Sequence, residues 1–124
     1  MLTTLVGLQL DQIDTPALLV DLPTLDRNIA LMAEATSTRG VGWRPHAKAH
    51  KSPAVAHRFL AAGAHGVTCA KLGEAEVFAA AGVRDILIAN EIVGPIKARR
   101  LAALATYCDI MVAVDSLENA RHLD

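Results

Sequence analysis

Residues 66–89, GVTCAKLGEAEVFAAAGVRDILIA, contain two short apolar segments with a helical pattern between them. Residues 66–70 and 85–89 have the composition of buried strands, while residues 72–81 have the spacing of a helix that ends at Gly82. Nearly continuous apolar strands that alternate with helices are typical of a parallel sheet buried on both faces. This stretch therefore predicts an α/β fold.

The same alternation of strand and helix extends over the rest of the chain. Further strands are predicted at 17–21, 41–48 and 109–114, helix starts at Thr24, Ser52, Pro95 and Ser116, and the end of the first helix at Gly40. A doubly wound sheet and a (β/α) barrel both fit this alternation. No dinucleotide-binding or Walker glycine motif follows a strand, which favours the barrel. A complete barrel needs about 250 residues. We therefore expect this chain of 124 residues to form about the first half of a barrel.

Composition and charge exclude several classes of protein. The chain is 52% hydrophobic, with a net charge of -1 that comes from interspersed charges, so disorder and binding to nucleic acid or anionic membranes are not expected. It has no apolar run of about 20 residues and no basic leader at its N-terminus. Cys69 and Cys108 lie in apolar segments, as buried thiols of a reducing compartment do. We expect a cytoplasmic protein with small-molecule partners.

Residues 44–51, RPHAKAHK, carry the chemistry that the sequence reveals. In an extended strand, one side of this segment would present Arg44, His46, Lys48 and His50. Four polar side chains are costly in a covered sheet unless they face a site, and sites of parallel sheets lie at the carboxyl ends of the strands. Lys48 lies near that end. Nearby cations and limited access to water favour its neutral amine, which imine formation requires.

Other interpretations of this segment stay open. The segment could be a solvated strand edge with an ordinary run of charges. His46 and His50 have the spacing of a helical metal pair, but Pro45 favours a strand and no third ligand lies nearby. Contact of one of these histidines with a cofactor or substrate is the better interpretation. Lys51 is expected to be a solvated charge.

Polar residues also follow the other predicted strands. Asn90 is a site candidate because a buried amide can orient a ligand by paired hydrogen bonds. Lys71 either lines the mouth of the site or is a surface lysine. Asp115 and Ser116 are explained adequately by helix capping.

Four stretches together resemble a known family. They are DTPALLVD at 14–21 with Leu25 and Arg27-Asn28-Ile29, RPHAKAHKS at 44–52, LGEAE at 72–76 and NEIV at 90–93. In this order they are similar to the fold-type III pyridoxal-phosphate enzymes, in the branch of D-threonine aldolase, 3-hydroxy-D-aspartate aldolase and eukaryotic-type D-serine dehydratase. The Pro-His-x-Lys-x-His-Lys pattern is the most specific of the four.

The resemblance implies a fold and a set of site residues. The fold is the N-terminal half of an alanine racemase-like (β/α)8 barrel that begins at about Val41. Residues 1–23 then contain a strand of a second, β-rich domain, and residues 24–124 form the first half of the barrel. Lys48 matches the lysine that binds pyridoxal 5'-phosphate as a Schiff base. The remaining assignments come from the strand pattern rather than from the resemblance: cofactor contacts by Arg44, His46 and Asn90, and contact with the substrate or with the residues around the site by His50 and Lys71.

The resemblance also implies the activity, the metal and the assembly. The aldolase members cleave D-3-hydroxy amino acids to glycine and an aldehyde with a manganese-like ion, whereas the dehydratases use zinc and expel the hydroxyl group. The segment 90–95 favours the aldolase. A non-catalytic pyridoxal-phosphate carrier and a degenerate remnant are alternatives. We expect a homodimer when full length and no metal ligand within this chain, and therefore little activity from the chain alone.

Overall fold

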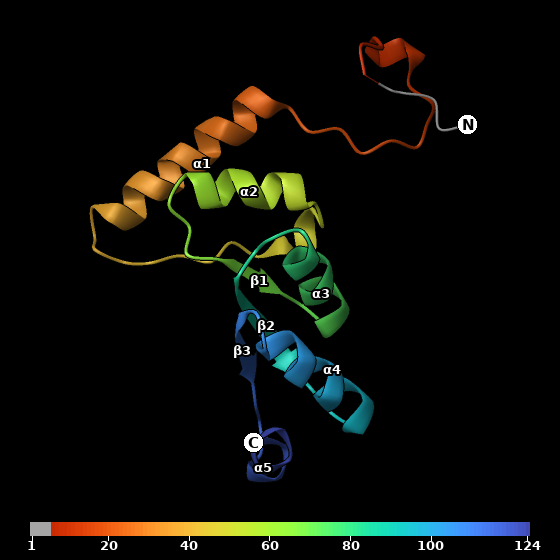
Figure 1. Cartoon of the computed structure of the whole chain (residues 1–124). Helices are drawn as coiled ribbons and strands as arrows, with labels where there is room; N and C mark the ends of the chain where they lie inside the picture. The colour runs from red at the N-terminus through yellow and green to blue at the C-terminus, as the bar shows by residue number, and fades with distance from the viewer. Residues whose placement is uncertain (1–5) are drawn as a thin grey trace.

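A computed structural model describes residues 6–124 of the chain. Residues 1–5, the start of the segment interpreted as lacking a leader, lie outside the described residues. The helices are α1 (Leu22–Ser37), α2 (Pro53–Ala61), α3 (Leu72–Ala80), α4 (Pro95–Ala105) and α5 (Leu117–Leu123). The strands are β1 (Val67–Cys69), β2 (Asp85–Glu91) and β3 (Asp109–Ala113), and short 3-10 helices cover Leu10–Gln12 and Ala47–Ala49. Figure 1 shows how these elements follow one another.

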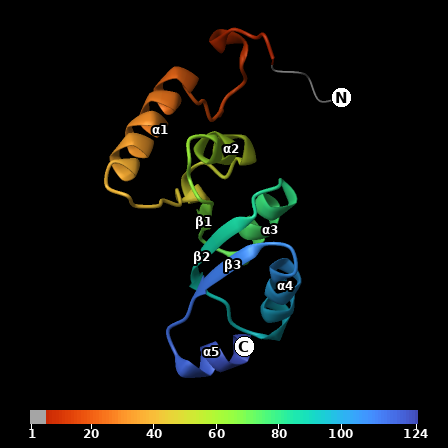
Figure 2. The same cartoon turned by 60° about the vertical axis from the view of Figure 1, so that its left-hand side comes forward.

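The strands form one parallel sheet in the order β1-β2-β3. Val67 pairs with Ile86, and Ile86 pairs with Ile110. Because β1, β2 and β3 run in the same direction, their carboxyl ends lie at one edge of the sheet. Helices α3 and α4, which connect the strands, lie on the same side of the sheet in both views (Figures 1 and 2). This repeated strand-helix unit is the α/β arrangement that the sequence predicts.

The core lies between the sheet and these helices. Alternate strand residues point toward α3 and α4 and are fully buried, as Val67, Ile86 and Ile88 show. Phe78 of α3 and Leu104 of α4 pack against them in the same cluster. On the opposite side of the sheet, residues such as Leu87 and Met111 are only half-buried. Within residues 6–124, the sheet is therefore covered on one face rather than on both.

Local capping signals place most helix ends where the sequence predicts them. The Ser52 hydroxyl accepts a hydrogen bond from the Val55 amide, and the Ser116 hydroxyl accepts one from the Asn119 amide. The prediction that Thr24 caps the first helix is wrong. Asp21 is the cap, because its carboxylate accepts a hydrogen bond from the Thr24 amide at 2.8 Å, so the helix begins earlier.

Two predicted strands differ from the structure. Residues 17–21 form no strand and are exposed, since no other strand lies beside them in the described part of the chain. Residues 41–48 form only an isolated parallel bridge, between His46 and Thr68. After this bridge the backbone tightens into the 3-10 helix Ala47–Ala49, which we call the Lys48 turn. Of the five predicted strands, only those at 66–70, 85–89 and 109–114 therefore make up the sheet in residues 6–124.

The two cysteines are buried, as predicted. Both thiols are free and buried. Burial, together with the negative charge of Glu74, raises the pKa of the Cys69 thiol to about 12, so this thiol stays protonated and unreactive. Among residues 6–124, none of the helices combines the length and the apolarity that a membrane crossing would require.

Candidate active site

The Lys48 turn lies at the carboxyl-end edge of the sheet, directly after the bridge between His46 and Thr68. Ala47 is buried in the core, whereas Lys48 is exposed. Within residues 6–124, no hydrogen bond or ion pair engages the Lys48 Nζ atom. The turn therefore anchors its backbone through one small side chain and presents a primary amine to the outside.

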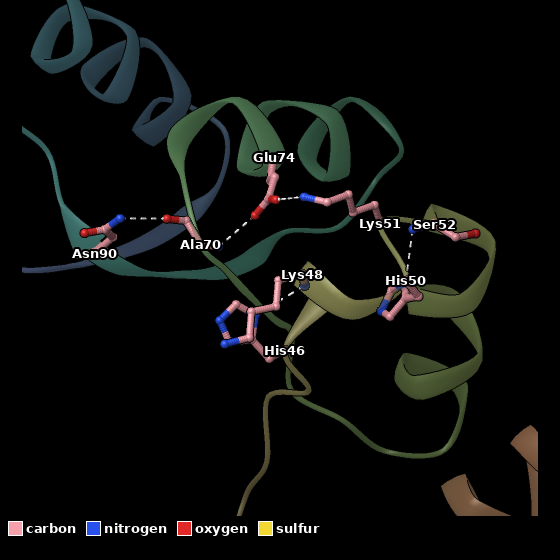
Figure 3. A network of polar contacts seen from close by, with 8 residues as sticks. All are labelled: His46, Lys48, His50, Lys51, Ser52, Ala70, Glu74 and Asn90. Atoms are coloured by element: carbon pink, nitrogen blue, oxygen red, sulfur yellow. Dashed lines mark hydrogen bonds and ion pairs between the residues drawn. The ribbon is translucent and has the colours of Figure 1, made fainter. Parts of the chain in front are cut away.

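His46 holds the start of this turn. Its Nδ1 atom accepts a hydrogen bond from the Lys48 amide at 3.3 Å (Figure 3). An Nδ1 atom that accepts leaves the proton of a neutral imidazole on Nε2. His46 can therefore donate an Nε2–H hydrogen bond to a ligand beside Lys48.

His50, like His46, accepts a hydrogen bond from the backbone amide two residues further on, but its ring points into the core. Its Nδ1 atom accepts a hydrogen bond from the Ser52 amide at 3.0 Å, and its ring packs 5.8 Å from the Phe59 ring and 6.2 Å from the Phe78 ring, centroid to centroid. Burial lowers the pKa of His50, so the ring is neutral at pH 7. Its Nε2 atom is buried without a hydrogen-bond partner among the described residues. His50 supports the turn from the core side and does not share an exposed face with Lys48.

A buried carboxylate ties the Lys48 turn to the end of β1. Glu74, in the first turn of α3, accepts a hydrogen bond from the Ala70 amide at 2.8 Å and pairs with the Lys51 ammonium. The hydrogen bond from Lys51 is the main cause that holds the pKa of Glu74 below its ordinary value. Lys51 itself has a positive φ of 49°, which a non-glycine residue rarely adopts. The Lys51 side chain is 60% exposed, as expected of a solvated charge, but the sequence did not predict its ion pair with Glu74.

Asn90 extends this network across the sheet. Its Nδ2 atom donates to the Ala70 carbonyl at 3.0 Å, and its Oδ1 atom accepts from the Glu91 amide at 3.0 Å. Figure 3 shows the contacts running from Asn90 through Ala70 and Glu74 to Lys51. Asn90 and Lys71 also line one hollow of about 300 Å³ beside α3 and α4. The amide of Asn90 thus fixes the strand ends, and its side chain is exposed rather than buried.

Arg44 lies away from this group. Its guanidinium contacts both carboxylate oxygens of Asp85, at 2.5 and 2.8 Å, and Asp85 begins β2. The pair therefore lies at the amino-end edge of the sheet, opposite the Lys48 turn. The predicted face shared by Arg44, His46, Lys48 and His50 does not form. The reason is that Arg44 is drawn to a carboxylate, His50 packs into the core and the backbone turns at Ala47.

These groups define the chemistry that the edge can perform. An exposed primary amine, an imidazole N–H donor and an amide are suited to attach a carbonyl compound and to orient it. Within the described residues, no three His, Cys, Asp or Glu side chains gather in a way that could hold a metal ion. Sequence reasoning missed Glu74, although a carboxylate in the first turn of a helix beside a strand end is a recognisable anchor.

The comparison with known protein families decides the family. A model described as the alanine racemase N-terminal domain matches residues 20–124. The chain belongs to the alanine racemase N-terminal domain family. The expected α/β fold and the resemblance are thereby confirmed, and the match contains the Lys48 turn and the whole sheet.

Individual proteins are similar to this chain over nearly its whole length. The chain is 46% identical over 113 residues to a D-threonine aldolase of Arthrobacter sp, covering 91% of this chain and 30% of that protein. It is 42% identical to a D-threo-3-hydroxyaspartate dehydratase of Delftia sp. (strain HT23), covering 88% of this chain and 29% of that protein. The crystal structure of D-threonine aldolase from Filomicrobium marinum matches with a TM-score of 0.89 and 47% identity, over 92% of this chain and 31% of that chain. The chain thus spans about 30% of the length of the curated relatives it matches.

Proposed function

We propose that this chain supplies the cofactor-attachment part of a pyridoxal-phosphate lyase that cleaves D-3-hydroxy amino acids to glycine and an aldehyde. The observation that carries the proposal is the placement of Lys48, an exposed amine on a turn held at the carboxyl-end edge of a parallel sheet. Active sites of barrels are built at this edge. The names of the relatives support a lyase.

The residues of this edge fit the attachment of pyridoxal phosphate. Lys48 offers an amine outside any ion pair of the described residues, and His46 offers an Nε2–H donor within two residues of it. Attachment needs the neutral amine of Lys48, and His46 can orient the attached ring by a hydrogen bond. When bound, the cofactor supplies an electron sink for cleavage next to the amino group. Asn90 and Lys71 lie near each other at this edge of the sheet and supply further polar side chains.

The divalent metal that the resemblance implies has no ligand cluster in residues 6–124. Manganese and zinc therefore enter this proposal only as additions to the test below. No step of the reaction is assigned to a metal on these residues.

A second candidate activity is dehydration of a D-3-hydroxy amino acid. The similarity to the dehydratase of Delftia sp. favours it, at 42% identity against 46% for the aldolase of Arthrobacter sp. Both reactions use the same attachment lysine, so the Lys48 turn does not choose between them. The choice rests with the groups around the hydroxyl group of the substrate.

The test compares products. The complete reading frame that encodes this chain is incubated with D-threonine, D-serine and L-threonine, with and without manganese or zinc. Glycine and acetaldehyde from D-threonine support the aldolase, whereas a keto acid and ammonia from either D-amino acid support the dehydratase. Turnover of L-threonine alone, or no D-specific turnover with either metal, contradicts both proposals.

A further inference from the structure

Two lysines lie three positions apart at the proposed attachment site, and their side chains differ in their contacts. Lys48 is exposed, and no ion pair among residues 6–124 engages its ammonium. Lys51 pairs with Glu74. An aldehyde that enters this edge therefore meets two amines within one short segment.

The Glu74 side chain is fixed in place by burial and by a backbone hydrogen bond. Its side chain is 9% exposed, and one of its carboxylate oxygens accepts the Ala70 amide hydrogen at 2.8 Å. The other oxygen receives the Lys51 ammonium. A carboxylate that is fixed by a backbone amide at the end of β1 loses little side-chain entropy when it binds a cation, which strengthens the pair relative to a fully exposed one.

Lys51 is fixed from its backbone side as well. Its amide donates to the Ala47 carbonyl at 2.8 Å, across the Lys48 turn, and its φ of 49° places it in the left-handed region. The main chain thus directs the Lys51 side chain away from the course of the turn and onto Glu74. A non-glycine residue keeps such a backbone only where the surroundings enforce it.

We propose that Glu74 selects the amine that carries the cofactor, by engaging the Lys51 side chain in an ion pair and leaving the Lys48 amine free to react. This inference rests on the proposed function. Attachment requires a lone pair: the neutral amine nitrogen bonds to the aldehyde carbon, a C=N bond forms, and the aldehyde oxygen leaves as water. The ammonium of Lys51 has no lone pair, and releasing a proton from it removes the charge attraction to Glu74. Glu74 is therefore a positioning residue that acts through Lys51 and not through contact with the cofactor.

The direct test maps the amines that react. The chain is incubated near neutral pH with excess pyridoxal phosphate, reduced with borohydride so that each C=N bond becomes a stable amine, digested, and the pyridoxyl label on each lysine is quantified. Glu74→Gln keeps an acceptor for the Ala70 amide but removes the charge that holds Lys51. We expect the ratio of label on Lys48 to label on Lys51 to fall by about three- to tenfold in E74Q, because Lys51 loses its ion pair and becomes as free to react as Lys48.

A matched variant shows whether Glu74 selects the amine or only stabilises the Lys48 turn. Lys51→Arg preserves a cation for Glu74 but cannot form the bond, so the label on Lys48 should stay at the wild-type level. In the double variant E74Q/K51R, Lys48 should again carry the label. Loss of the Lys48 label in E74Q/K51R but not in K51R would show that Glu74 acts by holding the turn rather than by selecting the amine.

A measurement on the unsubstituted chain keeps the inference testable even if E74Q does not fold. Trace acetylation with acetic anhydride modifies neutral amines, and Lys97 on α4 provides an exposed reference. We expect Lys51 to react at least about threefold more slowly than Lys97. Equal or faster reaction of Lys51, or an unchanged label ratio in folded E74Q, overturns the inference. A wild-type chain without label on Lys48 overturns the proposed function instead.

Discussion

Arg44 contacts both carboxylate oxygens of Asp85 across Gly66, at 2.5 Å from Nε and 2.8 Å from Nη2. Gly66 lies between the two residues in the sheet, because the residue that follows it, Val67, pairs with Ile86. A Cβ atom at position 66 would lie 2.0 Å from the Asp85 carbonyl oxygen and 2.5 Å from Oδ1. The ion pair and the close approach of the two strands thus both need a glycine at this position.

The first prediction concerns this contact. Gly66→Ala should lower the free energy of unfolding by about 3 kcal/mol, since the new methyl group meets backbone that cannot move aside. The control is Gly73→Ala in α3, where the nearest atom to the new Cβ is Arg100 Nη2 at 4.0 Å. That change should be neutral or stabilising by up to about 1 kcal/mol. Urea unfolding of the two variants measures the difference, and equal stabilities would contradict the close packing at Gly66.

The second prediction concerns the core that supports the Lys48 turn. Phe78 is fully buried and lies beside the His50 ring, whereas its neighbour Val77 is 54% exposed. Phe78→Ala should cost about 3–5 kcal/mol of stability, because it opens a cavity between α3 and the turn. Val77→Ala should change stability by less than about 0.5 kcal/mol. If V77A proved as harmful as F78A in the same unfolding assay, the orientation of α3 would be wrong.

The third prediction concerns the pH dependence of stability. Burial lowers the pKa of His50 below its ordinary 6.5, and the hydrogen bond from Lys51 lowers the pKa of Glu74 below its ordinary 4.5. In both cases the unfolded chain binds the proton at a higher pH than the folded chain does. The contribution of each group is therefore present above its unfolded pKa and lost as the pH falls through its folded pKa.

Two variants show which residue causes each loss of stability. His50→Asn retains an acceptor for the Ser52 amide but does not titrate, so the loss that begins near the ordinary pKa of 6.5 should disappear. Glu74→Gln should remove the loss that begins near 4.5. Thermal melting at a series of pH values from neutral to acid measures both. A wild-type chain whose stability rises on acidification in either range would contradict the assigned directions.

Sequence patterns predicted the elements that local chemistry determines. The helix starts at Ser52 and Ser116 are set by a hydroxyl and an amide three residues apart, which the sequence displays directly. The apolar strands 66–70 and 85–89 were recognisable because they are buried by residues of their own strand-helix unit. The predicted start of the first helix, Thr24, lies after the observed start. Asp21 and Thr24 are both good caps, and only the backbone conformation shows that Asp21 is the cap.

The chemical segment was predicted less well because distant residues shape it. The Lys48 turn depends on Glu74, which lies 23 positions beyond Lys51, and the direction of Arg44 depends on Asp85, 41 positions away. An alternating pattern of polar residues predicts one shared face only if the backbone stays extended. Here the ring of His46 takes the amide hydrogen of Lys48 that an extended strand would have left for a neighbouring strand. The roles assigned to Lys48, His46 and Asn90 toward a cofactor stay predictions.

The attachment of pyridoxal phosphate to Lys48 is the central claim, and one measurement tests it most directly. The chain is reduced with borohydride in the presence of pyridoxal phosphate, and the labelled peptides are sequenced by mass spectrometry, with Lys48→Arg and Lys97→Arg treated in parallel. We predict a pyridoxyl group mainly on Lys48, lost in K48R and retained in K97R. A label found mainly on Lys51 or Lys71, or spread evenly over the lysines of the chain, would contradict the claim.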